Sequence, residues 1–109
     1  MSAATPERRE AKARILVVDD DPDQVLLLKT GLEASGYGVV PCSSGAAALD
    51  VLQLGPIDCV VTDVLMDGMT GIELCERIAG AFPDLPVIVV TTSNRLETAI
   101  AAIRVAAYD

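Results

Sequence analysis

Short apolar runs alternate with longer amphipathic segments along most of the chain. Four runs have the length and the β-branched content of strands: residues 15–18, 38–42, 59–63 and 87–91. The first run is apolar without interruption, which is typical of a parallel strand that is buried on both faces. Pro41 cannot donate to a sheet ladder, so it predicts that the second run lies at an edge of the sheet.

Each apolar run is followed by a segment with helical periodicity and a capping signal. Asp21-Pro22-Asp23-Gln24 predicts a helix that begins with a capping box, and Ser35-Gly36 predicts its end. Three further helices are expected: from Ser43 or Ser44 to Leu54, over 72–81 behind a Thr70/Glu73 capping box, and over 94–106 behind an Asn94/Glu97 capping box. Strands and helices that alternate in this way predict an α/β fold with a parallel sheet.

Carboxylates stand where two of the predicted strands end. Asp19 and Asp20 follow the first run directly, and Asp63 ends the third. The carboxyl ends of parallel strands meet at one edge of the sheet, where open α/β proteins bind ligands. Carboxylates gathered there repel one another and cost desolvation energy, so the pattern indicates a bound cation. An all-oxygen donor set indicates a hard ion, Mg²⁺ or Mn²⁺.

The neighbouring polar residues have structural explanations that compete with a functional one. Asp21 is explained as a helix N-cap, and Asp23 as a first-turn acid that complements the helix dipole. Asp63 beside a bound Mg²⁺ has the chemistry to attack a phosphoryl group and form an aspartyl phosphate. Thr91, at the end of the fourth run, could offer its hydroxyl to phosphoryl oxygens. Strand propensity alone explains a lone threonine equally well, but its pairing with Asp63 favours the functional role.

Composition narrows the class of protein. Sixteen acids against eight bases give a net charge of -8, which argues against nucleic-acid binding through phosphates. There is no histidine, and the three cysteines lie within apolar patterns, which predicts reduced, buried thiols in a cytoplasmic protein. The apolar runs are too short to span a membrane, and residues 1–13 read as a flexible tail rather than a signal peptide, ahead of one domain over 14–109.

Three separated segments occur here in the order known from one family. They are ILVVDDDPD, VVTDVLMDGMTGIEL and PVIVVTTSNRLETAIAAIRVAAYD. From Arg14 to Asp109 the chain resembles the receiver domain of two-component response regulators. The resemblance implies a flavodoxin-like three-layer α/β sandwich with strand order 2-1-3-4-5. The pattern ETAIAAI is similar to receivers fused to sigma-factor-dependent transcription activators.

The same resemblance implies roles for particular residues. Asp63 would accept a phosphoryl group from a sensor histidine kinase. Asp20, Asp63 and the backbone carbonyl of Leu65 would ligate Mg²⁺, with Asp19 acting mainly through water. Thr91 would contact a phosphoryl oxygen and couple the site to the last helix. The partners implied are the kinase, a fused output domain and a second copy of the receiver, with no direct contact to nucleic acid or membrane.

Several positions depart from the family pattern. The loop after the acceptor usually reads Met-Pro, whereas here Met66 is followed by Asp67. Losing the proline frees the backbone and adds an acid near the metal, so tighter cation binding and a more mobile loop are both compatible with the change. Thr92 stands where a smaller residue is common and would narrow access to the phosphoryl group. Leu65 and Ser93 offer no obvious group to position water, which predicts a long-lived phosphoryl state.

The chain also stops before the last strand and helix of the family pattern. Those elements carry an aromatic switch residue and a lysine that holds a phosphoryl oxygen. Lys12 and Lys29 belong to the tail and the first helix and cannot replace it. A protein that ended at Asp109 would expose residues 87–91 as an edge strand and would be marginally stable, oligomeric or domain-swapped. We expect instead a shortened piece of a longer protein.

Three other functions compete with a signalling receiver. A Mg²⁺-dependent phosphatase of the haloacid dehalogenase type also uses a strand-end aspartate, but it expects an acid where Leu65 stands. A pseudo-receiver that only binds proteins would fit the absent lysine but not the intact acids. Flavodoxin-type cofactor binding is disfavoured because the turn after the first strand offers carboxylates instead of a phosphate cradle.

Overall fold

The computed structural model describes residues 13–91 and 95–108. Strands and helices alternate along this part of the chain. The elements are β1 (Arg14–Val18), α2 (Pro22–Ala34), β2 (Gly38–Cys42), α3 (Gly45–Leu54), β3 (Cys59–Asp63), α4 (Gly71–Ala81), β4 (Val87–Val90) and α5 (Arg95–Tyr108).

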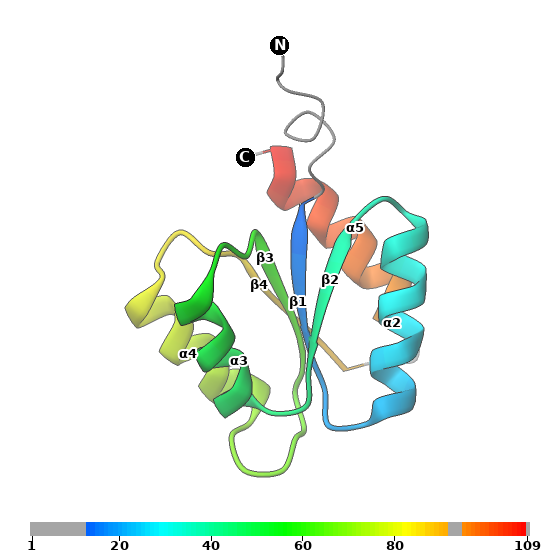
Figure 1. The fold of residues 1–109 in the computed structure, drawn as a ribbon. Coiled ribbons are helices and arrows are strands. Elements are labelled where there is room, and N and C mark those ends of the chain that lie inside the picture. Colours follow the sequence, from blue (N-terminus) through cyan, green and yellow to red (C-terminus); the bar gives the residue numbers. More distant parts are fainter. Residues whose placement is uncertain (1–12, 92–94, 109) are drawn as a thin grey trace.

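The four described strands form one parallel sheet in the order β2-β1-β3-β4. Helices α2 and α5 cover one face of this sheet and α3 and α4 cover the other (Figure 1). The predicted three-layer α/β architecture is therefore confirmed, with the strand order expected for these strands. Pro41 lies in β2, which is an outer strand as predicted.

Two apolar layers fill the spaces between the sheet and the helices. Alternate residues of β1 enter opposite layers, because successive side chains of a strand point to opposite faces. Ile15 and Val17 pack with α2 and α5 residues such as Leu28 and Ile103. Leu16 and Val18 pack with α3 and α4 residues, and these four apolar residues of β1 are all buried. The uninterrupted apolar run in the sequence is explained by this two-sided burial.

The predicted helix signals are found in three of the four helices. Ser44 caps α3 by accepting the Ala47 N–H, and Thr70 and Glu73 form the capping box of α4. Asp21 caps α2, but its carboxylate accepts from the Asp23 N–H rather than pairing with Gln24 in a capping box as expected. A short Asx-type turn thus replaces the longer motif, because Oδ1 already reaches the nearer amide. The expected cap of α5 at position 94 lies outside the described residues.

Two of the three cysteines are buried as predicted, whereas Cys75 is half-buried. All three are free thiols, and Cys42 and Cys59 are buried. Burial raises the pKa of both, that of Cys59 to about 11, because a thiolate would be poorly solvated in the core. Both are therefore neutral thiols near pH 7. No helix in the described part of the chain is long and apolar enough to cross a membrane.

Candidate functional site

The strand register brings the predicted acids to one edge of the sheet. Val18 of β1 pairs with Thr62 of β3, so Asp19 comes level with Asp63 at the carboxyl ends of two adjacent strands. On the other side of β3, Asp63 itself pairs with Val90. Thr91 follows Val90 directly, so the three strand ends deliver carboxylates and a hydroxyl to the same edge. This edge lies at the lower end of the molecule as drawn (Figure 1).

Each of the three predicted carboxylate ligands accepts a backbone hydrogen bond. The Asp21 N–H donates to Asp19 Oδ1 at 3.0 Å, and the Val64 N–H donates to Asp63 Oδ1 at 2.9 Å. The Asp67 N–H donates to Asp20 Oδ2 at 3.0 Å. Amide donors of this kind fix the orientation of a carboxylate.

The three acids differ in exposure. The Asp19 side chain is only 1% exposed, and its backbone N–H donates to the Cys42 carbonyl at 3.1 Å, which extends the β1–β2 ladder past the strand. Asp63 is half-buried and Asp20 is exposed. The site therefore has a fixed, desolvated side at Asp19 and an open side at Asp20, from which an ion or a phosphodonor could enter.

The chemistry of the donor set fits Mg²⁺. Asp19, Asp20 and Asp63 offer carboxylate oxygens, and the sequence contains no histidine to compete with them. In the described residues, however, no three such side chains converge closely enough to form a closed metal site. Coordination by all three would require at least one of the carboxylates to move toward the others.

The remaining predicted site residues lie at the same edge where the structure describes them. Thr91 is exposed just after β4, which ends at Val90 and so is one residue shorter than predicted. Leu65 follows Asp63 by two residues, and its side chain is 76% exposed. An apolar side chain in that position points away from the core and offers no polar group to a water molecule. Thr92 and Ser93 lie outside the described residues.

The β3–α4 loop is closed by contacts that the sequence did not reveal. The Gly71 N–H donates to the Val64 carbonyl at 2.8 Å, and a Cβ atom on Gly71 would overlap the backbone carbonyl of Asp63. Met66 is buried, with its sulfur 3.9 Å from the Thr62 hydroxyl. The spacing of residues in the sequence did not predict these contacts. A glycine at the first position of a helix is the one feature that could have indicated a close approach of two backbone segments.

A pocket of about 500 Å³ flanks the acids on the β2 side of the sheet. Asp19 and Asp20 form part of its wall, together with Leu26 and Lys29 of α2 and Cys42 at the end of β2. Its lining in the described part of the chain does not include Asp63. The pocket therefore borders the candidate metal ligands without reaching the candidate acceptor.

Comparison with known proteins agrees with this fold. The family model of the response regulator receiver domain matches residues 15–109. The transcriptional regulatory protein GlrR of Escherichia coli K12 is 41% identical over 90 residues, which are 83% of this chain and 20% of GlrR. The response regulator MprA of Mycobacterium tuberculosis H37Rv is 35% identical over 96 residues, which are 88% of this chain and 42% of MprA. The chain thus spans less than half the length of these curated relatives.

Solved structures give the same result. The response regulator TrrA of Thermotoga maritima, in complex with Mg²⁺-BeF, aligns with a TM-score of 0.79 at 26% identity over 85% of this chain and 97% of that one. A receiver domain protein of Clostridium thermocellum aligns with a TM-score of 0.70 at 31% identity over 86% of this chain and 76% of that one.

The chain belongs to the response regulator receiver domain family. It is a receiver domain of a two-component system, as the three sequence motifs predicted.

Proposed function

We propose that the chain is a phosphorylatable receiver in which Asp63 accepts a phosphoryl group from a sensor histidine kinase. The observation that carries the proposal is the register of three adjacent strand ends. This register places Asp63 level with Asp19 on one side and with Val90, the residue before Thr91, on the other. A nucleophile, candidate metal ligands and a hydroxyl therefore lie at the same edge of the sheet.

The transfer would join the Asp63 carboxylate, as nucleophile, to the phosphorus of a phosphohistidine donor. One carboxylate oxygen of Asp63 forms a bond to phosphorus while the phosphorus–nitrogen bond of the phosphohistidine breaks. The electron pair of the broken bond stays on the imidazole nitrogen of the kinase, which takes a proton from solvent. The Val64 N–H on Asp63 Oδ1 holds the carboxylate in one orientation for this attack.

Asp19, Asp20, Asp63 and the Leu65 carbonyl are the proposed Mg²⁺ ligands. The bound ion would neutralise negative charge on the transferred phosphoryl oxygens. The TrrA structure, obtained with Mg²⁺-BeF, supports this choice of ion by family likeness. Mn²⁺ has the same preference for oxygen ligands and is expected to substitute.

Two residues beside the acceptor would govern the fate of the transferred phosphoryl group. Thr91, which is exposed at the end of β4, would donate its hydroxyl to a phosphoryl oxygen and pass the change toward α5. Leu65, with its exposed apolar side chain, would leave hydrolytic water unpositioned. We therefore propose a phosphoryl group that survives for minutes or longer, and a lifetime of seconds would contradict this part of the proposal.

The partners are inferred from the same chemistry. The phosphodonor would be a histidine kinase, and the readout would be an output domain or a second receiver that recognises the surface near α5. The longer relatives GlrR and MprA are a transcriptional regulatory protein and a response regulator, which supports a role in regulating transcription. The net charge of -8 argues against direct nucleic-acid contact by this domain.

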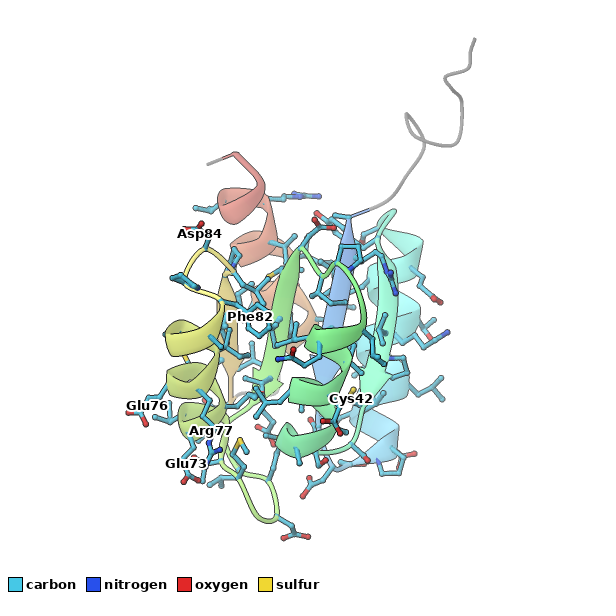
Figure 2. All side chains as sticks on the ribbon, turned by 60° about the vertical axis from the view of Figure 1, so that its left-hand side comes forward. Cys42, Glu73, Glu76, Arg77, Phe82 and Asp84 are labelled. Atoms are coloured by element: carbon cyan, nitrogen blue, oxygen red, sulfur yellow. The ribbon has the colours of Figure 1, made fainter. Side chains whose placement is uncertain are left out.

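Intact-protein mass spectrometry after incubation with acetyl phosphate and Mg²⁺ tests the proposal. We expect one added phosphoryl group, which is lost in Asp63→Asn and without divalent cation. Asp84→Asn is the matched control, because Asp84 is an exposed acid at the far end of the molecule, on the α4–β4 turn (Figure 2). An adduct that persists in Asp63→Asn would show that another residue accepts the phosphoryl group. No adduct in any form would favour the pseudo-receiver, a domain that only binds proteins.

A further inference from the structure

One hydrogen bond crosses the candidate site between two segments that are far apart in the sequence. The backbone N–H of Asp67, in the β3–α4 loop, donates to Oδ2 of Asp20, just after β1, at 3.0 Å. The two residues are 47 positions apart. The bond therefore ties the loop that comes after the candidate acceptor to one of the candidate metal ligands.

The position of the donor is set by the rest of the loop. Met66, the residue before the donor, is buried in the layer between the sheet and α3 and α4. Beyond the donor, Met69 lies against the first residue of α3, with its sulfur 2.8 Å from where a Cβ on Gly45 would be. Gly68 has a φ of 79°, a left-handed conformation that glycine adopts without strain. The amide of Asp67 is thus held between two anchored methionines.

The bond depends on the kind of residue at position 67. Any residue except proline carries the N–H that Asp20 accepts, and a proline there would remove the donor. The Asp67 side chain itself is exposed and adds a negative charge beside the ligands. Position 67 therefore acts on the site in two separable ways, through its amide and through its carboxylate.

We infer that the amide of Asp67 positions the Asp20 carboxylate for cation binding, which makes Asp67 a positioning residue of the metal site. This inference rests on the proposed function, because it assumes that Asp20 is a Mg²⁺ ligand. Because Asp20 is exposed, the hydrogen bond from the anchored loop is the main restraint on its carboxylate among the described residues. With Oδ2 accepting from the amide, Oδ1 would be the oxygen that remains to bind the ion.

Direct measurement of Mg²⁺ binding by calorimetry on the 109-residue chain separates the two effects. Asp67→Ala keeps the N–H and removes the charge, and we expect it to raise the Kd for Mg²⁺ about twofold, less so at high salt. Asp67→Pro removes both, and we expect a Kd about three- to tenfold above that of Asp67→Ala, with little dependence of this difference on salt. The ratio between the two variants isolates the amide.

A second measurement does not depend on whether the proline variant folds. In the ¹H–¹⁵N spectrum of the chain, the Asp67 amide proton is expected to resonate downfield and to move upfield in Asp20→Ala. An unchanged Asp67 resonance in that variant would overturn the inference. Equal Mg²⁺ affinity in folded Asp67→Pro and Asp67→Ala would also overturn it, while leaving the proposed function intact. Absence of Mg²⁺ binding by the unaltered chain would overturn both.

Discussion

Gly71, the first residue of α4, lies directly against the backbone carbonyl of Asp63, the last residue of β3. A Cβ atom at position 71 would overlap that carbonyl oxygen and would also approach the backbone of Val64. The helix can begin so close to the candidate acceptor only because its first residue has no side chain. The geometry of the acceptor and the start of α4 are thereby coupled through backbone atoms.

The first prediction concerns this contact. Gly71→Ala forces backbone to move against backbone, so we expect a loss of about 2 kcal/mol or more in the free energy of unfolding and a strongly reduced yield of phosphorylated Asp63. Urea denaturation and intact-protein mass spectrometry measure the two effects. Gly80→Ala in the same helix is the control, since nothing lies within 4 Å of the place that a Cβ atom would take there. It should stabilise the protein by about 0.5–1 kcal/mol through helix propensity. Equal stability of both variants would contradict the prediction.

A second glycine, Gly31, lies at the contact between α2 and α5 on the other face of the sheet. A Cβ on Gly31 of α2 would overlap the end of the Leu96 side chain of α5. Gly31→Ala is expected to cost about 1–2 kcal/mol in the free energy of unfolding, because Leu96 must leave its position against the core.

The double variant tests whether this contact is the cause. In a Leu96→Ala background the space is open, so the same Gly31→Ala change should be neutral or stabilising by up to about 1 kcal/mol. A double-mutant cycle measured by urea denaturation gives the coupling free energy between positions 31 and 96. Additive effects of the two changes would show that the two side-chain positions are independent.

The third prediction concerns metal removal. If Asp20 is a ligand, Mg²⁺ at about 100 times its Kd should stabilise the folded chain by about 2.7 kcal/mol over the EDTA-treated chain. Asp20→Asn should abolish most of this gain, and in EDTA it should be at least as stable as the unaltered chain, because it removes one of the charges that repel one another near Asp19. Thermal unfolding with and without Mg²⁺ measures both. Full retention of Mg²⁺ stabilisation by Asp20→Asn would exclude Asp20 from the ligand set.

The fourth prediction is a loss of stability at alkaline pH. Cys59 is buried next to β1, and desolvation raises its pKa from 9.0 to about 11 in the folded chain. Between these values the unfolded chain releases the thiol proton and the folded chain keeps it, so the free energy of unfolding falls as pH rises. The full contribution is about 2–3 kcal/mol, present below pH 9 and lost by about pH 11.

Chemical denaturation at several pH values between about 8 and 11 measures this slope. Cys59→Val fills a similar volume without a titrating group and should show a smaller fall in stability over the same range. Identical slopes for the two proteins would assign the alkaline loss to other groups.

The local patterns of the chain were sufficient to predict the elements and the edge of the sheet at which the candidate acids lie. Uninterrupted apolar runs require burial on both faces, and a run that ends on an acid delivers that acid to the carboxyl edge of a parallel sheet, as Asp19 and Asp63 illustrate. The capping box at Thr70 and Glu73 was readable because its two bonds join residues three apart. Periodicity and capping act over one or two turns of chain, so they need no knowledge of the rest of the fold.

Other features arose only when distant segments met. No pattern linked Asp67 to Asp20, 47 residues away, or indicated that Gly71 would lie against Asp63. The pocket between α2 and the end of β2 likewise depends on how a helix lies over a strand. The sequence by itself determined which elements form and which chemistry reaches the edge of the sheet, since both depend on local burial and spacing. Only the tertiary structure decided which carboxylate oxygen accepts a hydrogen bond from each loop amide. The distance between amide and oxygen depends on how both apolar layers pack, and local patterns do not contain that information.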